Sequence, residues 1–434
     1  MLKSERECCD SSASGMKQRK RVLYLSPVLP LNAYSGFQYR AIETLRYLAQ
    51  RYEVDLLTCG PNAPSPEPCT FDLQLLRRWK VVPEPGRSTL GELARLCHAD
   101  PVHVQIYSQP ETIDTVKQWV SESRYDAIFM NRTFQYRAID AIPPSMRPPV
   151  IVDQHAAETD VWENLVRNHP KTLFRLYARL NAPKVARFER RVYRELRGAI
   201  SITERDRAIT ERLHPATALV MIPQGIDTTE YLPCNDPEYD YRTLLFSGTA
   251  ATRNVDAMRW FAEQVFPRVR AAIPEAKVLW IGNVTYEHVP FLAGDSAYKL
   301  TGFVDKTPPY FNKGLVFIAP FRMGEGMKTK IVEALAMGRM VVSTSMGVQG
   351  VETDGLPYVR IEDDPVRFAD AIIEFLEKRE WAEAQAGKAR AFAVDKYAWE
   401  KILTRMDVLF ENKAAQKDAA ERASLEFGAE SESK

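Results

Sequence analysis

The stretch Pro320-Phe-Arg-Met-Gly-Glu-Gly-Met-Lys-Thr-Lys-Ile-Val-Glu-Ala-Leu-Ala-Met-Gly338 follows a short apolar run that ends at Ala319. The apolar run predicts a buried strand, and the spacing of apolar residues that follows predicts a helix beginning at about Met327. Gly324 and Gly326 allow the backbone to approach a ligand closely, and a helix start presents N–H groups that lack partners. A strand, a glycine-rich loop and a helix in this order favour an anion site in an α/β fold.

The charged side chains of this stretch suit a diphosphate. Arg322, Lys328 and Lys330 place three positive charges around the predicted start of the helix. Lys330 and Glu333 are three residues apart and share a helix face, so Lys330 could hold a phosphate while Glu333 accepts hydrogen bonds from sugar hydroxyls. The alternative is a glycine-rich turn with a solvated basic face, because Thr329 stands where a dinucleotide-binding pattern needs its third glycine.

Other short apolar runs predict the strands of two parallel sheets. In the first half they are Arg21–Ser26, Val54–Thr58, Ala127–Met130, Val150–Val152 and Ala199–Ile202. In the second half they are Thr243–Ser247, Lys277–Ile281, Leu315–Ala319 and Met340–Ser343, with a helix expected over Val255–Val269. This alternation predicts an α/β fold with two doubly wound, Rossmann-like domains facing each other across a cleft at the carboxyl ends of their strands.

The break in this pattern at Pro223-Gln-Gly-Ile-Asp227 places the junction between the two domains near residue 225. We therefore expect a first domain over residues 21–222 and a second over 223–395. Residues 1–20 are polar and predict a disordered leader, and residues 413–434, rich in Ala, Glu, Lys and Ser, predict a flexible tail.

The composition excludes several classes of protein. With 45% hydrophobic and 26% charged residues the chain is neither wholly disordered nor a rod, and a net charge of +1 argues against a dedicated nucleic-acid binder. The six cysteines show no CxxC spacing, which argues against a structural zinc site and fits a protein of the reduced cytoplasm. We see no secretory signal and no apolar stretch long enough to cross a membrane, so we expect a cytoplasmic protein.

Two further loops follow predicted strands. After Ser247, Gly248 permits close backbone approach, Asn254 is a candidate helix N-cap and Arg253 could bind a phosphate through two hydrogen bonds. The alternative for Arg253 is a solvated loop position. After Val150–Val152, His155 lies where a first-domain loop would reach the cleft, although a lone histidine is more often structural than catalytic.

Residues 167–197 carry a strong local charge. Ten lysines and arginines against two glutamates give this segment a net charge of +8, and large apolar residues alternate with the charges. The plain interpretation is a pair of amphipathic helices with a solvated basic face. The functional alternative is docking on an anionic membrane surface or a lipid diphosphate, which would make the protein peripheral on the inner face of the membrane.

Taken together, these loops resemble glycosyltransferase family 4, of the GT-B fold, and most closely the bacterial sugar transferases of exopolysaccharide gene clusters. The likeness covers roughly residues 21–410. It rests on the order and spacing of Ser35-Gly36, Asp153-Gln-His155, Ile222-Pro-Gln-Gly-Ile-Asp227, Phe246-Ser-Gly248, Arg253-Asn-Val-Asp256, Thr301-Gly-Phe-Val304 and Arg322 to Gly338.

The resemblance implies a nucleoside diphosphate sugar as donor, bound in the second domain. It implies that Arg253 and Lys330 hold the diphosphate, that Glu333 binds the ribose, and that Gly326 and Met327 offer backbone amides to the donor. Of the remaining positions, Glu325 matches the first acid of the family's Glu-x7-Glu motif, His155 a histidine near the reacting centre, and Gly36 a position where the acceptor or the leaving phosphate meets the first domain. It also implies a C-terminal helix, residues 396–412, that packs back on the first domain.

The expected activity is retaining transfer of a sugar, of hexosyltransferase type, to a hydroxyl of a glycan or lipid-linked acceptor in cell-surface polysaccharide synthesis. No D-x-D motif is present, which suits metal-independent chemistry without a cofactor. The chain departs from the family at Gln224, where asparagine is usual, and at Ala156-Ala157, which are less polar than is common. Two rivals stay open: a GT-B sugar-nucleotide epimerase, and a catalytically silent assembly or membrane-binding partner.

Overall fold

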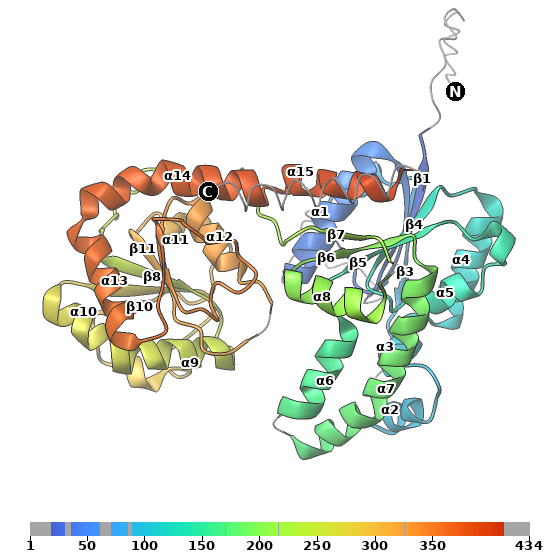
Figure 1. The fold of residues 1–434 in the computed structure, drawn as a ribbon, viewed down its shortest axis with the longest axis horizontal. Helices are drawn as coiled ribbons and strands as arrows, with labels where there is room; N and C mark the ends of the chain where they lie inside the picture. Colours follow the sequence, from blue (N-terminus) through green and yellow to red (C-terminus); the bar gives the residue numbers. More distant parts are fainter. Residues whose placement is uncertain are drawn as a thin grey trace, which may run out of the picture.

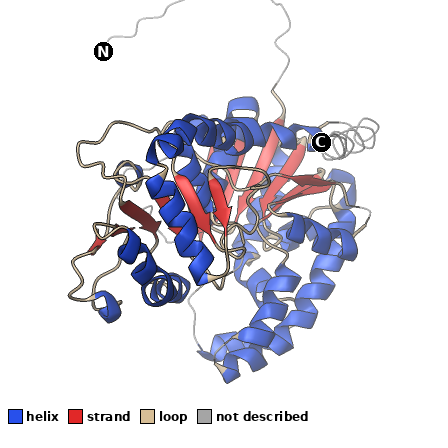
Figure 2. Ribbon diagram, turned by 60° about the vertical axis from the view of Figure 1, so that its left-hand side comes forward, coloured by secondary structure: helices blue, strands red, loops and turns tan. Residues whose placement is uncertain are grey.

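The computed structural model of the protein describes residues 19–30, 36–60, 71–85, 89–169, 171–215, 217–324 and 326–411. Within them the chain forms two α/β lobes, each built on one parallel sheet (Figure 1). Helices cover the faces of both sheets, as the view coloured by secondary structure shows (Figure 2). The apolar runs found in the sequence are the buried strands of these sheets.

The first sheet has the strand order β3-β2-β1-β4-β5-β6-β7. Its strands are β1 (Arg21–Ser26), β2 (Glu53–Gly60), β3 (Arg78–Pro83), β4 (Ala127–Asn131), β5 (Val150–Gln154), β6 (Gly198–Ser201) and β7 (Leu219–Met221). The helices of this lobe are α1 (Gly36–Arg51), α2 (Thr89–Leu96), α3 (Val102–Tyr107), α4 (Pro110–Glu122), α5 (Tyr136–Asp140), α6 (Glu158–Asn168), α7 (Thr172–Glu195) and α8 (Glu204–Leu213).

The second sheet has the strand order β10-β9-β8-β11-β12-β13. Its strands are β8 (Thr243–Ser247), β9 (Lys277–Ile281), β10 (Tyr298–Leu300), β11 (Val316–Ala319), β12 (Met340–Ser343) and β13 (Val359–Ile361). The helices are α9 (Thr252–Trp260), α10 (Phe266–Ala272), α11 (Pro308–Phe311), α12 (Thr329–Ala336), α13 (Pro365–Glu377), α14 (Arg379–Tyr397) and α15 (Trp399–Ile402).

The strand order reverses between β1 and β4 in the first sheet and between β8 and β11 in the second. In an open parallel sheet, loops on either side of such a reversal diverge and leave a crevice beyond the carboxyl ends of the strands. The loop from β8 to α9 and the loop from β11 to α12 therefore flank the crevice of the second lobe. These are the two loops that the sequence singled out.

The predicted doubly wound sheets are confirmed, with local differences in where the elements begin and end. The helix predicted from Val255 begins at Thr252 and is interrupted by a π-helical turn, Phe261–Val265, before α10. The helix predicted from Met327 begins two residues later, because the Lys328 side chain donates to the loop carbonyls of Gly324 and Gly326 and holds this segment as a loop. The short strands β3, β7, β10 and β13 were not predicted; β7, β10 and β13 have only three residues each.

Asn254 is not the N-cap that the sequence suggested. Ala251 occupies the cap position of α9 without a side-chain hydrogen bond. Asn254 is buried, and its amide donates to the carbonyl oxygen of Thr249 at 2.8 Å. Its side chain therefore shapes the loop after β8 rather than the helix end.

The end of the chain returns to the first lobe, as Figure 1 shows for the segment that follows α14. The backbones of Ile226 and Ala398 pair side by side, and Gly225 lies against the Trp399 ring. From there the chain continues through α15 and the 3-10 turn Leu403–Leu409. The buried side chains of this last segment join the core of the first sheet: Trp399, Ile402, Leu403, Met406, Leu409 and Phe410.

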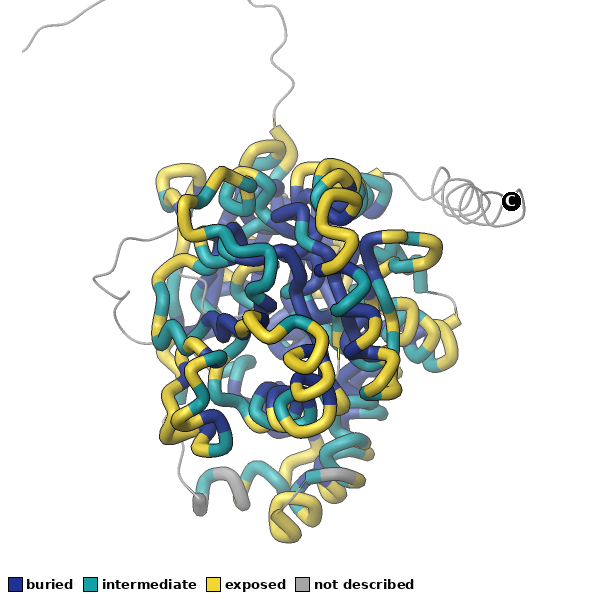
Figure 3. The backbone as a smooth tube through the Cα atoms, turned by 90° about the vertical axis from the view of Figure 1, so that its left-hand side faces the viewer, coloured by how far each residue is buried: buried dark blue, intermediate teal, exposed yellow. Residues whose placement is uncertain are grey.

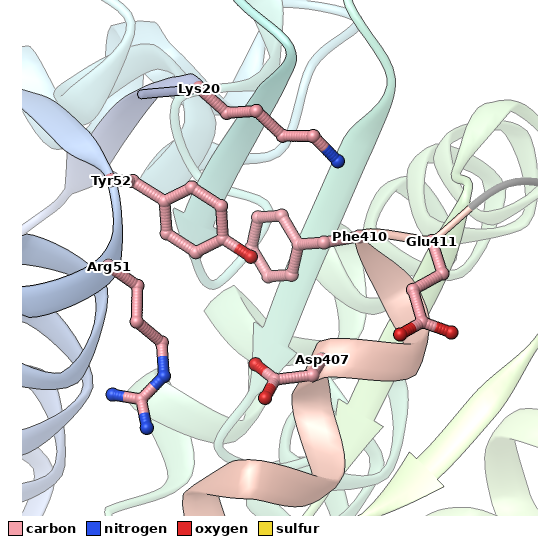
Figure 4. A pocket seen from close by; sticks show the side chains of 6 residues that line it. All are labelled: Lys20, Arg51, Tyr52, Asp407, Phe410 and Glu411. Atoms are coloured by element: carbon pink, nitrogen blue, oxygen red, sulfur yellow. The ribbon is translucent and has the colours of Figure 1, made fainter. Parts of the chain in front are cut away.

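The contact of this segment with the first lobe leaves an open pocket of about 370 Å³, which Figure 4 shows from close by. The Tyr52 and Phe410 rings stack there with centroids 4.9 Å apart, and Tyr47 donates a hydrogen bond to Asp407 at 2.8 Å. Lys20, which precedes β1, also lines this pocket. This pocket therefore lies at the amino end of β1, away from the crevice at the carboxyl ends of the strands.

Candidate functional site

Lys330 brings the two crevice loops of the second lobe together. It lies in the first turn of α12, and its Nζ is 2.7 Å from the position that a Cβ on Gly248 would occupy. Its ammonium group also lies 5.6 Å from the centre of the Phe321 ring. Only a glycine at position 248 leaves room for this amino group against the loop after β8.

The electrostatics of Lys330 and Glu333 depend on each other. The pKa of Lys330 is lowered to about 8: burial lowers it most, Glu333 raises it, and the cations Arg253 and Lys328 lower it. Burial likewise raises the pKa of Glu333, and Lys330 lowers it. Both side chains are partly exposed to solvent. A cation and a carboxylate on one helix face thus border the crevice, as their spacing predicted.

Arg253 is the second cation open to a ligand. It is exposed, and it forms no ion pair with any residue of the described ranges. Its Cδ lies 3.2 Å from where a Cβ on Gly324 would be, and the φ of Gly324 is +113°. Residue 324 therefore has to be glycine for both conformational and steric reasons. The Arg253 side chain therefore stands beside the glycine-rich loop.

Two other predicted cations have protein partners instead. The guanidinium of Arg322 makes a two-point contact with Asp256, at 2.6 and 3.2 Å. The amino group of Lys328 donates to the carbonyl oxygen of Gly326 at 2.7 Å. Arg322 therefore attaches the glycine-rich loop to α9, and Lys328 holds the loop in its own conformation. The local sequence could not reveal this, because Asp256 is 66 residues from Arg322.

In the first lobe, His155 follows β5 and packs against Phe37, with ring centres 4.2 Å apart. Its Nε2 lies 3.8 Å from the carboxylate of Asp153, and no described residue forms a hydrogen bond with it. Burial, with Arg40 and Arg132, lowers the pKa of His155 well below its ordinary value. The imidazole is therefore neutral near pH 7 and can accept or donate a hydrogen bond.

Arg40 is a positioning residue that sequence analysis missed. It is fully buried in α1 and binds both carboxylate oxygens of Asp153, at 2.8 and 3.0 Å. It also donates to the carbonyl oxygen of Pro223 at 2.9 Å. Next to this contact, Gln224 donates to the carbonyl oxygen of Gly36 at 2.9 Å. The junction between the lobes is thus tied to the start of α1.

The local sequence contained little signal for Arg40, because Thr44 and Tyr47, which share its helix face, are not strongly apolar. The structure buries all three residues. A charged residue that is buried needs a partner. The partner itself, Asp153, is 113 residues away and is found only from the fold.

His155 and the glycine-rich loop line one cavity. The cavity has a volume of about 210 Å³ and takes His155, Asp160 and Asp206 from the first lobe and Gly326 and Gly350 from the second. The two lobes approach closely at Gly350, where a Cβ would lie 3.1 Å from Met327 and 3.2 Å from Thr203. The candidate site therefore lies between the lobes.

The structure does not describe two of the predicted positions. Glu325 and Ser35 lie outside the described residues. Across the described ranges, no three potential metal ligands of the His, Cys, Asp or Glu type gather at one place. No helix in the described part of the chain is long and apolar enough to cross a membrane.

Two family models match the chain in succession. The model described as "Glycosyl transferase 4-like domain" matches residues 35–225, and the model described as "Glycosyl transferases group 1" matches residues 241–378. Together they span most of the chain and fall on the first and second lobes respectively.

The individual proteins and solved structures that resemble this chain share little sequence identity with it. An uncharacterized 44.6 kDa protein in the cps region of Klebsiella pneumoniae is 25% identical over 199 residues, which are 44% of this chain and 49% of that protein, so the match spans about half of the relative. The structure of HepE from Anabaena in complex with UDP and glucose has a TM-score of 0.58 at 14% identity, covering 90% of this chain and 98% of that one.

Sucrose-phosphate synthase from Thermosynechococcus elongatus has a TM-score of 0.59 at 17% identity, again over 90% of this chain and 98% of that chain. At these identities the structures establish the fold, which is GT-B. Because two successive family models match the two facing lobes, the chain belongs to glycosyltransferase family 4 and resembles the sugar transferases of bacterial exopolysaccharide clusters.

Proposed function

We propose that this protein is a retaining, metal-independent glycosyltransferase of hexosyltransferase type. It moves a sugar from a nucleoside diphosphate sugar to a hydroxyl of a glycan or lipid-linked acceptor in cell-surface polysaccharide synthesis. The observation that carries the proposal is the convergence of Lys330, Gly248 and Arg253 at the crevice of the second lobe. This group offers two cations and glycine backbone to a diphosphate, beside the Glu333 carboxylate.

In this proposal Arg253 and Lys330 neutralise the charge that develops on the diphosphate as it leaves. A guanidinium can donate two parallel hydrogen bonds to a phosphate, and an ammonium group acts as a point charge. The first turn of α12 adds N–H groups that point toward an anion. Glu333 accepts hydrogen bonds from the ribose hydroxyls, and the backbone at Gly326 and Met327 lies alongside the donor.

The chemical step breaks the bond between C1 of the sugar and the phosphate oxygen. The acceptor oxygen forms its bond to C1 on the same face of the sugar, and its proton passes to the departing diphosphate oxygen. The electron pair of the broken bond leaves with that oxygen, so no enzyme nucleophile is required. His155, neutral and on the opposite wall of the shared cavity, orients the reacting sugar or the acceptor by hydrogen bonding. Glu325 is proposed to contact the donor sugar.

The acceptor lies on the side of the first lobe, in the cavity that His155 shares with Gly326. The solved relative HepE was captured with UDP-glucose, which makes UDP-sugars the first donors to test. A cytoplasmic location, as the scattered cysteines of the sequence predict, is part of this proposal.

The central experiment is substitution of Lys330 by alanine. Transfer should fall by about 100- to 1,000-fold, the usual effect of removing one charge-stabilising donor from a transition state. Lys388→Ala, an exposed lysine of α14, is the matched control and should leave transfer unchanged. Near-normal turnover of Lys330→Ala in a folded protein contradicts the proposal.

The same assay separates the rivals. Donor incubated with enzyme and no acceptor should keep its sugar configuration, whereas a sugar-nucleotide epimerase would convert it. The stereochemistry of the product, followed by NMR, tests retention directly. Full activity in the presence of EDTA is expected, and a loss of transfer that added Mg²⁺ restores would contradict metal independence.

A further inference from the structure

The helix pair α6 and α7 projects from the first lobe, as Figures 1 and 2 show in the lower part of each view. The two helices pack along each other, and α7 buries Ala178, Val185 and Val192 on its inner side. The end of the pair near Thr172 extends beyond the sheet and its other helices. Figure 3 shows the same end at the bottom of the molecule, and the chain there is exposed at residues 172–176 of α7 and mostly half-buried in α6.

The outer side of α7 carries one continuous stripe. Residues spaced alternately three and four apart fall on one helix face, and here they are Leu173, Leu176, Leu180, Pro183, Arg187, Arg190 and Arg194. All seven are exposed. The stripe thus has an apolar part at the projecting end and a basic part toward the lobe, and we name it the α7 stripe.

Within the described part of the chain, no other segment covers the apolar part of the α7 stripe. Leu173 is 83% exposed, Leu176 55% and Leu180 53%. A globular protein commonly exposes a single leucine, but three on adjacent turns of one projecting helix form a patch that needs a partner. The neighbouring Arg175 and Arg179 are also exposed and flank these leucines with positive charge.

The basic part is equally open. Arg187, Arg190 and Arg194 form no ion pairs with the residues that the structure describes. The two glutamates of α7 do not neutralise them: Glu189 is buried against the start of α6, and Glu195 bonds to Arg147 at 3.0 Å. Leucines at the tip and arginines behind them match an anionic bilayer, whose apolar interior takes the leucines and whose headgroups take the arginines.

We propose that the α7 stripe docks the protein on the surface of an anionic lipid bilayer. The tip leucines enter the boundary between headgroups and acyl chains, and the three arginines bind lipid phosphates. Because α6 begins three residues after His155 and spans about 16 Å, docking at the tip holds the candidate cleft close to the bilayer. Docking uses neither donor nor acceptor residues, so it stands or falls independently of the proposed reaction.

The test is co-sedimentation of the full-length protein with phosphatidylcholine vesicles that contain or lack phosphatidylglycerol. Wild type should bind the anionic vesicles only, and binding should weaken as salt is raised. Replacing Arg187, Arg190 and Arg194 together by glutamine should lower the partition coefficient by about 100-fold, since each basic residue near an anionic surface contributes about fivefold. Replacing the three tip leucines by serine should lower it by at least about tenfold.

The matched control removes three exposed charges from the second lobe, with Lys299, Arg367 and Lys388 changed to glutamine. This variant should bind as wild type does, and all variants should keep the thermal shift produced by a nucleotide sugar. Equal binding of wild type to neutral and anionic vesicles would overturn the proposal. So would equal losses in the control, or a wild-type dimer in solution that the leucine substitutions dissociate, since the stripe would then join two copies.

Discussion

The amino group of Lys330 lies against Gly248, in a space that exists only because residue 248 has no side chain. The price of that position is desolvation, which lowers the pKa of the ammonium group to about 8. A phosphate that enters the crevice adds a second negative partner, beside Glu333, to a cation that is already partly desolvated. This arrangement suits binding of a charged ligand better than a lysine in full contact with water would, because less water must be removed.

The lowered pKa of Lys330 predicts a basic limit to activity. In the free enzyme Lys330 is protonated below pH 8, so diphosphate binding is strong there and weakens as the pH rises further. The value of kcat/KM for the donor should therefore fall above about pH 8, approaching tenfold per pH unit, because this parameter reports groups of the free enzyme.

Lys330→Arg keeps its charge throughout this range and should abolish the fall above pH 8, whatever its absolute activity. Arg253→Lys serves as the control, since it leaves Lys330 in place and should keep the fall. A wild-type profile that stays flat from pH 7 to 9.5 would show that Lys330 does not control donor capture.

Among the secondary-structure elements, α6 depends on a carboxylate from α7. Glu189 is buried and accepts hydrogen bonds from the backbone N–H groups of Glu158 and Thr159 at 3.1 and 2.8 Å. It thereby satisfies free donors at the first turn of α6, directly after the His155 loop. Burial nevertheless raises the pKa of Glu189 to about 7, against an ordinary value of 4.5.

Glu189 therefore predicts a pH-dependent contribution to stability. The folded state keeps a proton that the unfolded state releases between pH 4.5 and 7, so this contribution declines as the pH rises through that window. From pH 5 to pH 8 it should change by about 2 to 3 kcal/mol. Urea unfolding of wild type and Glu189→Gln at pH 5 and at pH 8 measures this change. Between pH 5 and pH 8, the unfolding free energy of wild type should fall by this amount relative to that of the variant. An unchanged difference between the two proteins would contradict the shifted pKa.

The junction between the lobes requires a glycine at position 225. A Cβ there would lie 2.4 and 2.6 Å from carbons of the Trp399 ring, so Gly225→Ala should lower the unfolding free energy by about 1 to 3 kcal/mol. Gly387→Ala is the control, because its Cβ in α14 meets nothing within 4 Å. A mid-helix glycine to alanine change should stabilise by about 0.5 to 1 kcal/mol. Melting temperatures that move in the same direction for both variants would refute this account.

The elements show where local sequence information ends. Strand β8 and strand β12 were predicted to the residue, and the Lys330–Glu333 pair follows from helical spacing alone. The pairing of Arg322 with Asp256 and of Arg40 with Asp153 was not predicted, because these residues meet only after the sheet has formed. The sequence could therefore identify which residues carry charge, but not which of those charges are already neutralised by protein partners.

At the scale of the whole molecule, the site is complete only when the lobes face each other. Arg253, Lys330 and Glu333 belong to the second lobe, whereas His155 belongs to the first. On the proposed function, donor binding needs one lobe, whereas transfer needs both lobes in register. The domain limits at residues 222 and 395 stay predictions. The roles of Arg253, Lys330, Glu333 and His155 stay predictions as well.

Gly350 separates donor binding from transfer experimentally. Its φ is +81°, and a side chain there would push on Met327 and on Thr203 of the opposite lobe. Gly350→Leu should hold the lobes apart and lower kcat/KM for transfer by about 10- to 100-fold, since small misplacements of reacting groups have effects of that size. The donor dissociation constant should change much less than the transfer rate does, because Arg253, Lys330 and Glu333 are untouched and only the contact at Met327 is disturbed.

Gly355→Leu is the matched control for this substitution. Its φ of +71° imposes a similar backbone strain, but nothing lies within 4 Å of its Cβ position. Gly355→Leu should therefore lose some stability and keep its transfer rate. Gly350→Leu should lose a similar amount of stability and, in addition, most of its transfer rate. Calorimetry with the donor and a transfer assay on both variants distinguish the outcomes. If Gly350→Leu transferred sugar as fast as Gly355→Leu does, the contact between the lobes at Gly350 would have no part in assembling the site.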